Sequence, residues 1–537
     1  MTSVLPQRVL SVRDGALLVE YDSLESVLSH FAALEQADLR GVHELIPAAK
    51  TILIRYDPWV VTGHEIARIL RQTPAVEQQR AHIEPVLIDV VYSGDDIVDV
   101  ANDLGVSIDE LIQRHTQAEW RGAFVGFAPG FVYCVSNDPL FEVSRKATPR
   151  TRIPSGSVAL ASNFSAIYPR ESPGGWQLIG RTDYNIWDLN RETPAAIQPG
   201  QYVRYRPVRE LVKLTDGPPS ASKLPETSDE TPLLEIIRPG LQLVLQDMGR
   251  KGLAKLGVPP SGAADRYACR QANRTVGNPA GSAALEIVGG GAEFRTNTRG
   301  VICLLGAQGP ASIISTSGET FPLQQGQPTP LEAGDHIKVG EITGGLRSYI
   351  AIRGGFALEP ILASLATDTL SGIGPGSLRA GDRLPLMPLR EDVNIHVVQP
   401  LDKSLTDLEA TESASSDAVE LDIVLGPRTD WFTEKAVEIL TEQQWTVSSQ
   451  VDRVGVRLEG ELALERAVTC ELPSEGAVTG AIQVPPSGQP VLFLPDHPVT
   501  GGYPVIGGVT EQHIDRLGQL TPGDVIRFRV SQPFTEY

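Results

Sequence analysis

The sequence predicts a mainly β protein with α+β parts: a β-barrel in each half of the chain and a small α+β domain at the N-terminus. Its 537 residues include 51 glycines and 41 prolines, a composition that suits many short strands joined by turns. A glycine-containing turn leads into a strand-like run four times, as expected where barrel-like sheets close. These runs lie at residues 199–203, 333–339, 380–386 and 522–528.

A set of turn-rich elements occurs twice in the same order, which is the strongest internal signal. Residues 154–157 (PSGS) and 174–180 (GGWQLIG) resemble residues 473–476 (PSEG) and 501–507 (GGYPVIG). Each set runs on to a Pro-Gly turn. Repetition of three elements in one order indicates two related barrels that present equivalent loops.

The stretch around the first copy, residues 126–182, is too rich in Gly, Pro, Ser and Arg to be one helix or one strand. Glycine permits positive φ and proline removes a backbone donor, so the stretch should form tight turns with N–H groups that can face a ligand. Hairpin turns without a ligand are the alternative. We expect residues 126–182 and 473–507 to form two sides of one site, held close because both lie in one chain.

The N-terminal domain, residues 1–84, alternates strand-like and helix-like runs. Residues 16–21 and 51–56 are predicted strands, and residues 25–34 and 64–72 carry helical spacing. Thr62 is the expected N-cap of the second helix. Such alternation predicts a small α+β unit with its helices on one face of a sheet.

The barrel of the first half is expected at residues 85–215. It opens with a buried strand (VLIDVVY), followed by an amphipathic helix that ends at Gly105. A second helix follows at residues 108–117, with Ser107 as its N-cap. Residues 216–232 are rich in Pro, Ser and acidic residues, and they form a linker because they have almost no apolar side chains to bury.

Short strands and turns predominate after the linker. We expect a first barrel domain of the second half at residues 233–405, a disordered acidic segment at 406–418 and a second barrel at 419–537. Helices are expected at residues 264–276 and 431–443.

Charge and composition exclude several classes of partner. The formal net charge of −20 argues against nucleic acid or an anionic membrane surface as the main partner. No apolar run is long enough to span a bilayer, and the first residues lack a signal-peptide core. The four cysteines, Cys134, Cys269, Cys303 and Cys470, are far apart, as expected of free thiols in a reducing compartment. We expect a cytoplasmic protein, with a homo-oligomer left open.

Several catalytic motifs are missing from the sequence. There is no phosphate-binding P-loop and no strand–GxGxxG–helix unit, and the glycines at 289–291 are predicted to form a turn. No clustered His and Cys set indicates a metal site, so none is predicted. His497 beside Asp496 suits a metal ligand or a base, although a lone surface histidine is the commoner case. A G-x-S-x-G elbow, an amidase Ser-Ser-Lys set and a biotin-carrying Met-Lys-Met are also absent.

Longer segments resemble a known pair of families. Residues 126–133, 149–161 and 172–182 resemble allophanate hydrolase subunit 1, a Kip inhibitor-like family that includes the B subunit of 5-oxoprolinase. The second half resembles allophanate hydrolase subunit 2, which is Kip antagonist-like and includes the C subunit of 5-oxoprolinase. The matching segments are residues 239–250, 257–265, 276–278, 284–286, 353–355, 426–432, 452–460 and 473–507.

The resemblance covers nearly the whole chain in order, which identifies it as a fusion of the two subunits. Together the halves are similar to the carboxyltransferase domain of urea carboxylase, which implies cyclophilin-like β-barrels. One departure is the segment after residues 353–355, FALEPILASLATDTLSG, which lacks the arginine expected in the family.

The resemblance implies three functions. The first is the B/C component of an ATP-dependent 5-oxoprolinase, which opens 5-oxoproline to glutamate with a separate, ATP-using A subunit. The second is the carboxyltransferase of a biotin-dependent urea or amide carboxylase, which would need a biotin carboxylase and a separate carrier. The third is a regulator of a sensor histidine kinase. No cofactor is assigned to this chain itself, because ATP would come through the partner and biotin on the carrier.

Both enzymatic options act on a small planar amide, where developing oxyanion charge must be stabilised. Backbone N–H groups of Gly-rich turns and fixed arginines suit that task, and carboxylates with neutral donors suit proton transfer. The catalytic candidates are Arg150, Gln177, Arg181, Glu475, Gln483, Asp496 and Tyr503. The substrate-binding candidates are Ser155, Gly156, Ser157, Gly174, Gly175, Asp247, Arg250, Asp452, Arg453, Gly501 and Gly502, with Arg152 as a further charge donor. For each Asp/Arg pair, a structural ion pair that locks a turn is an equal alternative.

Overall fold

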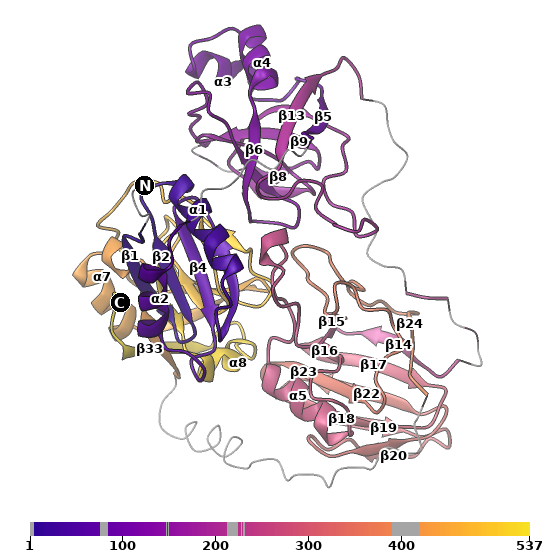
Figure 1. Ribbon diagram of the computed structural model, residues 1–537. Helices are drawn as coiled ribbons and strands as arrows, with labels where there is room; N and C mark the ends of the chain where they lie inside the picture. Colours follow the sequence, from indigo (N-terminus) through magenta and orange to yellow (C-terminus); the bar gives the residue numbers. More distant parts are fainter. Residues whose placement is uncertain are drawn as a thin grey trace.

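The computed structural model describes residues 5–75, 84–146, 148, 150–211, 224–226, 228, 231–388 and 418–537. The fold class predicted from the sequence is confirmed: the protein is mainly β, with an α+β unit at the N-terminus and a barrel in each half (Figure 1). The predicted linker lies mostly outside the described residues, and so does nearly all of the predicted acidic segment.

The N-terminal unit is a four-stranded antiparallel sheet with two helices. Its strands, in the order β1-β2-β4-β3, are β1 (Arg8–Arg13), β2 (Ala16–Glu20), β4 (Thr51–Tyr56) and β3 (Val42–Pro47). The helices are α1 (Leu24–Gln36) and α2 (Gly63–Gln72). Thr62 caps α2 as predicted, because its hydroxyl accepts from Glu65 N–H while the Glu65 carboxylate accepts from Thr62 N–H.

Both faces of this sheet are buried, which sets the position of the whole unit. One face packs under α1 and α2, with Leu17, Ile52 and Ile54 against Phe31 and Ile66. The other face, with Leu10, Leu18 and Leu53, packs against apolar residues of the C-terminal barrel such as Val478 and Phe493. The chain end also returns to this sheet, since Ser11 N–H donates to Thr535 O at 2.9 Å and Tyr537 N–H donates to Val9 O at 2.8 Å.

The first barrel is a seven-stranded sheet that nearly closes on itself. In sheet order its strands are β12 (Gln177–Arg181), β9 (Ser157–Ala161), β10 (Phe164–Ile167), β7 (Val132–Val135), β6 (Trp120–Val125), β13 (Tyr202–Pro207) and β5 (Val86–Val90). A bridge between Val91 and Arg181 joins the two ends. The helices α3 (Ile97–Asp103) and α4 (Ile108–Gln117) lie at its outer end, and Ser107 caps α4 as predicted. A ribbon of β8 (Arg150–Ile153) and β11 (Ser172–Gly174) extends from the barrel.

The segment expected to form a barrel at residues 233–405 forms two sheets around one core instead. One sheet is β20 (Thr320–Pro322), β19 (Ala311–Ile314), β22 (His336–Glu341), β17 (Gly290–Thr296), β14 (Leu233–Pro239) and β24 (Arg383–Pro385). The other is β15 (Gln242–Gln246), β16 (Ala284–Val288), β23 (Gly344–Ile352), β18 (Gly300–Gln308) and β21 (Thr329–Leu331), covered by α5 (Arg266–Thr275). Within residues 231–388, the part of this segment that the structure describes, each sheet ends in edge strands and does not close into the expected barrel.

The C-terminal barrel is closed. Around the ring its strands are β25 (Val419–Leu425), β32 (Val505–Val509), β29 (Ala481–Gln483), β30 (Val491–Phe493), β27 (Gly455–Glu459), β26 (Trp445–Val451) and β33 (Val525–Gln532). Its helical elements are η2 (Thr429–Trp431), α7 (Glu434–Glu442), η3 (Glu511–His513) and α8 (Ile514–Leu517). A ribbon of β28 (Glu475–Gly476) and β31 (Thr500–Gly501) corresponds to the β8–β11 ribbon.

The two barrels share strand order and register, which supports the predicted duplication. Trp120 pairs with Val203, and Val203 pairs with Val86; in the second barrel Trp445 pairs with Ile526, and Ile526 with Val419. Both indoles are fully buried and donate to the carbonyl five residues earlier, at 2.9 Å for Trp120 and 3.0 Å for Trp445. The barrels are therefore two copies of one architecture.

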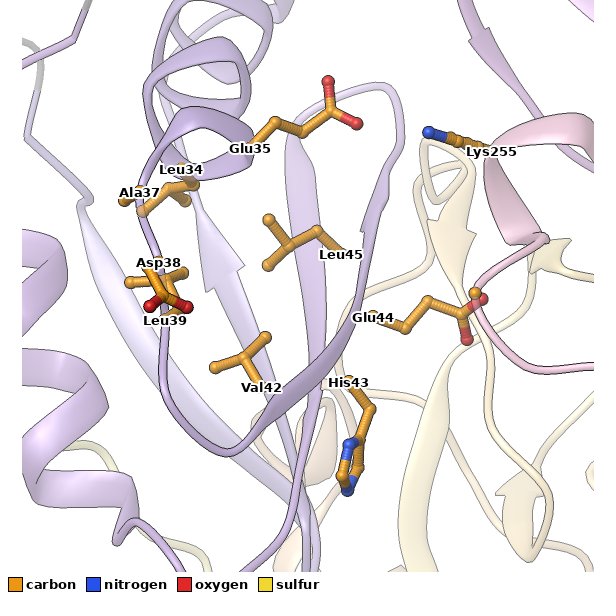
Figure 2. A pocket seen from close by; sticks show the side chains of 11 residues that line it. Leu34, Glu35, Ala37, Asp38, Leu39, Val42, His43, Glu44, Leu45 and Lys255 are labelled. Atoms are coloured by element: carbon orange, nitrogen blue, oxygen red, sulfur yellow. The ribbon is translucent and has the colours of Figure 1, made fainter.

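A pocket lies between α1, β3 and the short helix η1 (Ala254–Leu256) (Figure 2). Its lining includes Glu35, Glu44 and Lys255. Glu44 is already engaged, because its carboxylate accepts from Ala254 N–H at 3.0 Å and from Arg55 at 2.9 Å. The bond to Ala254 ties the N-terminal sheet to the second half of the chain.

Candidate functional site

The site lies where the two predicted loop regions meet. Gly126 packs directly on Thr500, so closely that a β-carbon on Gly126 would overlap the Thr500 hydroxyl. Arg145 forms an ion pair with Glu471 at 2.9 Å, and the Ser474 hydroxyl lies 3.5 Å from the Tyr133 hydroxyl. The loops expected to form two sides of one site are thus in contact.

The N-terminal sheet closes a third side of this junction. Ala49 N–H, from the turn between β3 and β4, donates to Ser474 O at 3.1 Å. Ala48 and Ala49 pack against an aromatic cluster at the end of the first barrel, which includes Phe131, Tyr133, Tyr168 and Trp176. Apolar walls of this kind strengthen charge interactions beside them because they exclude water.

A buried carboxylate organises the cations of the first barrel. Asp96 accepts two hydrogen bonds from Arg150, at 2.7 and 2.9 Å, one from Lys146 at 2.7 Å and one from Leu178 N–H at 2.7 Å. Burial raises the pKa of Asp96, but the hydrogen bonds from Arg150, Lys146 and Leu178 outweigh it, so the pKa is lowered and the carboxylate stays charged. We call Asp96, Lys146 and Arg150 the first triad; its net charge is +1.

The second barrel carries a triad with the opposite signs. Arg428 donates to both oxygens of Glu475 and to Glu20, which comes from β2 of the N-terminal sheet. Burial lowers the pKa of Arg428, but the negative charges of Glu475 and Glu20 raise it by more. The pKa of Arg428 is therefore raised overall, and the guanidinium stays charged. This second triad, Arg428 with Glu475 and Glu20, has a net charge of −1, and the N-terminal sheet covers it.

Backbone pairing shows that the two triads occupy equivalent places. Asp96 N–H donates to Leu178 O and Arg428 N–H donates to Val505 O, each at 2.9 Å. Across the ribbons, Arg150 pairs with Gly174 and Glu475 pairs with Gly501. The equivalence predicted between residues 174–180 and 501–507 agrees with this register.

The equivalence predicted between PSGS and PSEG is wrong in register. Gly156 O accepts from Thr182 N–H and Gly480 O accepts from Val509 N–H, each at 2.8 Å, so Gly156 corresponds to Gly480. Both glycines have positive φ, 78° and 85°, which a turn of this shape requires. The Pro-Ser pairs therefore match in composition, although they stand at different places in the two ribbons.

Two of the three N–H groups of the predicted backbone nest, those of Gly156 and Ser157, are used within the turn. Gly156 N–H donates to Tyr168 O at 2.8 Å and Ser157 N–H to Pro154 O at 3.4 Å. The hydroxyls of Ser155 and Ser157 donate to Pro169 O and Pro154 O. These residues shape the turn, and the charged donors at the junction come from side chains instead.

Gln177 lies beside the first triad with an unused acceptor. Its side chain is 8% exposed, and its amide Nε2 donates to Ser144 O at 3.1 Å. Within the described part of the chain, its Oε1 has no hydrogen-bond partner. A buried acceptor without a partner is costly, so a ligand N–H there would be favoured.

Six other candidates line the junction at varying depth. Gly174 packs on the Tyr168 hydroxyl, and Gly175 O accepts from Lys146 N–H at 2.8 Å. A β-carbon at Gly502 would lie 3.3 Å from Arg145 Nη1, and one at Gly501 would lie 2.8 Å from Gln483 Nε2. Tyr503 is 39% exposed, with its carbonyl accepting from Gln483 at 3.4 Å.

Two of the predicted charge donors are exposed. Arg181, at the end of β12, is exposed to solvent. Arg152 is exposed as well, and it forms an ion pair with Glu171 at 2.6 Å. Solvent screens exposed charges, so neither arginine supplies a fixed charge as Arg150 does.

A separate network buries two more candidates, Asp496 and Arg453, between the two-sheet segment and the second barrel. Arg453 holds both oxygens of Asp496 at 3.0 Å and also binds Glu286; all three side chains are fully buried. Asp496 further accepts from Ser261 at 2.6 Å and from Thr369 at 2.7 and 2.8 Å. With its lone pairs occupied, Asp496 suits structural support better than proton transfer.

The other polar pairs of this region also close loops. Asp247 accepts from Gly249 N–H, the Ser364 hydroxyl and Leu365 N–H, while Arg250 donates to the carbonyls of residues 361, 364 and 366. Asp452 accepts from the N–H groups of Val454 and Gly455. Burial lowers the pKa of His497 to about 4, so this histidine is neutral; its Nδ1 lies 2.8 Å from Pro498 O.

Three other kinds of feature bear on function within the described residues: metal sites, membrane-spanning helices and reactive thiols. Among them, no group of three or more His, Cys, Asp and Glu side chains is placed to hold a metal ion. No described helix is long and apolar enough to cross a membrane. Cys134, Cys269 and Cys303 are buried, and burial raises the pKa of Cys134 to about 12, so this thiol is a poor nucleophile.

The sequence interpretation missed Asp96, Lys146, Arg428 and Glu20. Asp96 follows an ordinary strand and looks like a helix cap, and Lys146 lies outside both repeated segments. The only available signal was the position of Arg428 in the GPRTDWF segment, shortly after a strand, where Asp96 stands in the first half.

Comparison with known proteins places these features in a family. The model of the carboxyltransferase domain, subdomains A and B, matches residues 256–530, and the model of subdomains C and D matches residues 7–197. The structure aligns with the solved structure of TTHA0988 at a TM-score of 0.81 and 31% identity, over 96% of this chain and 99% of that chain.

Two curated relatives each match one half of the chain. The chain is 33% identical over 299 residues to the 5-oxoprolinase C subunit of Escherichia coli K12, across 55% of this chain and 90% of that protein. It is 35% identical over 182 residues to the 5-oxoprolinase B subunit of Escherichia coli O157:H7, across 33% of this chain and 82% of that protein. Urea amidolyase of Saccharomyces cerevisiae is 29% identical over 318 residues, across 56% of this chain but 17% of that protein.

Proposed function

Since this chain belongs to the carboxyltransferase-domain family, we propose that it is the fused B and C component of an ATP-dependent 5-oxoprolinase. In this role it opens the cyclic amide of 5-oxoproline to glutamate, together with a separate partner that uses ATP. One observation carries the proposal: halves similar to the B and C subunits of 5-oxoprolinase lie in one chain and meet at Gly126 and Thr500. The junction of the two halves is then the reaction site.

Opening the lactam needs an oxyanion to be stabilised as water adds to the carbonyl carbon, and a proton to reach the nitrogen as the C–N bond breaks. Lys146 and Arg150 supply positive charge held in place by Asp96, and fixed charge of this kind is effective because it needs no reorganisation. Gly174, which pairs with Arg150, packs on the Tyr168 hydroxyl, so the aromatic wall borders these partly exposed cations on one side. ATP bound by the partner would supply the driving force.

A biotin-dependent carboxyltransferase is the second candidate, and the similarity to urea amidolyase favours it. In that reaction a carboxyl group passes from carboxybiotin on a separate carrier to the nitrogen of urea or another small amide. The same junction would bind that acceptor. The two candidates differ in the substrate, which is an anion in 5-oxoproline and neutral in urea.

The test combines the purified chain with a partner of the 5-oxoprolinase A-subunit type, ATP and 5-oxoproline, and measures glutamate. Glutamate is expected when all four components are present and is absent when this chain is omitted. Arg299→Met serves as a matched control, because Arg299 is an exposed cation paired with Glu332 in the two-sheet segment. Carboxyl transfer from carboxybiotin to urea, without any glutamate in the first assay, would replace the proposal with the second candidate.

A further inference from the structure

We infer that the first triad is an anion site, in which Lys146 and Arg150 bind the carboxylate of an anionic amide substrate. This inference rests on the proposed function for its substrate class. It adds to that function the residues that select a carboxylate-bearing lactam over a neutral amide.

The charge balance of the first triad supports an anionic ligand. Two cations share the single carboxylate of Asp96, so one positive charge remains uncompensated within the triad. The negative charge of Asp95 also contributes to raising the pKa of Arg150, but Asp95 is exposed to solvent, which screens its charge. The cation is therefore available to a ligand that displaces water.

The spare hydrogen-bond donors of the triad also reach solvent. A guanidinium has five N–H donors and an ammonium has three, whereas Asp96 accepts two bonds from Arg150 and one from Lys146. The side chains of Lys146 and Arg150 are 28% and 24% exposed, but that of Asp96 is 2% exposed. The cations therefore face outward while the carboxylate that orients them is buried.

The second barrel shows why the two triads differ in role. There Glu20 of the N-terminal sheet completes the group and is itself paired with Arg8 at 3.4 Å, so protein side chains occupy the place. In the first barrel, the ion pairs of Lys146 and Arg150 within the described residues go to Asp96 alone. The duplicated fold thus has one filled copy of the site and one open copy.

The groups beside the first triad fit the rest of a lactam. Gln177, whose Oε1 is buried and unpaired among the described residues, directly precedes Leu178, the residue that binds Asp96. An acceptor at this place suits the lactam N–H. The cations of the first triad would then bind the carboxylate of 5-oxoproline, and Gln177 would bind its amide N–H. A neutral amide such as urea has no carboxylate and would leave the cations without a ligand.

The experiment measures binding to the full chain alone, by calorimetry or ligand-observed NMR, for 5-oxoproline and for 2-pyrrolidinone, the same ring without the carboxylate. We expect 5-oxoproline to bind at least about tenfold more tightly, as one charged hydrogen bond commonly contributes. Lys146→Met and Arg150→Met should remove this preference and leave 2-pyrrolidinone binding unchanged. Lys146→Arg should keep it, and so should the control Arg299→Met.

Lys146→Met leaves the two-bond pair of Asp96 and Arg150 intact, so it tests the site even if Arg150→Met does not fold. Equal binding of the two rings, or no binding of 5-oxoproline at millimolar concentration, overturns the inference even if glutamate is formed with the partner. Carboxylate-dependent binding without glutamate formation supports the anion site and rejects the proposed function. Inorganic phosphate is the competing anion: if it alone binds in a Lys146-dependent manner, the carboxylate assignment fails.

Discussion

Arg150 and Glu475 occupy the same position in the two barrels, opposite Gly174 and Gly501, and carry opposite charges. Each forms a two-bond ion pair with a residue that follows the first barrel strand, Asp96 for Arg150 and Arg428 for Glu475. The duplication thus kept the geometry of the pair and exchanged its signs. The pair of the first barrel reaches solvent through Arg150, and the N-terminal sheet covers the other.

Close packing of Gly126 against Thr500 predicts that the junction does not tolerate a methyl group. Gly126→Ala should lower activity or 5-oxoproline affinity at least about tenfold. The added β-carbon would overlap the Thr500 Oγ1, so the two loops must move apart to relieve the overlap. Thr500→Gly in the same chain should restore part of the loss. Gly300→Ala is the control, since Gly300 has an ordinary φ and no atom within 4 Å of the added carbon. Unchanged affinity in Gly126→Ala would contradict the close contact.

The two buried tryptophans predict matched stability effects. Trp445→Phe and Trp120→Phe each remove an indole donor and leave a buried carbonyl, that of Leu440 or His115, without its partner. Each should lower the free energy of unfolding by about 1–3 kcal/mol. Denaturant unfolding followed by circular dichroism measures this. Trp59→Phe is the control, because Trp59 is 96% exposed and should change stability by less than about 0.5 kcal/mol.

The buried network around Arg453 predicts a large loss on breaking it. Arg453→Met leaves Glu286 and Asp496 buried without their main cation and should cost about 3–5 kcal/mol. The unfolding transition that includes the second barrel should shift accordingly. Arg299→Met, an exposed pair, should stay within about 0.5 kcal/mol of the parent. If the two variants unfold alike, the network does not hold these parts together.

Asp265, the buried N-cap of α5 whose carboxylate accepts from Ala268 N–H, predicts a pH dependence of stability. Burial raises the pKa of Asp265 to about 7, and the charge of Asp515 adds to this. Because the folded-state pKa lies above the unfolded value, the contribution of Asp265 to stability is complete below about pH 4 and is lost as pH rises to about 7. Asp265→Asn keeps the cap to Ala268 N–H and removes the titration. We expect the free energy of unfolding of the variant, measured between pH 5 and 8, to increase relative to that of the parent as pH rises. If the two free energies change in parallel with pH, the raised pKa is contradicted.

Much of the local structure could be predicted from the sequence. Thr62 and Ser107 cap the expected helices, since a hydroxyl at that position satisfies an N–H three residues later. The strand at residues 51–56 and the turns that lead into β13, β22, β24 and β33 also lie where expected. These features depend on neighbouring residues alone, so short-range patterns contain them.

The repeated loops were only partly predictable. The glycine pairs at 174–175 and 501–502 indicated the correct equivalence, whereas the Pro-Ser pairs indicated a false one, because the register of a ribbon is invisible without its hydrogen bonds. The sequence also predicted a barrel at residues 233–405. Strand-rich composition does not distinguish a closed sheet from two sheets around one core, because closure depends on which strands pair.

By itself the sequence determined the strand-rich class, the duplication, the helix caps and the two loop regions that meet at the junction. Only the tertiary structure decided which charges those loops carry into the site. Asp96 finds Lys146 and Arg150 some fifty residues away, and Arg428 finds Glu20 across more than four hundred. A buried charge needs a partner of opposite sign, and the fold determines which distant residue becomes that partner. Local sequence patterns do not contain this information.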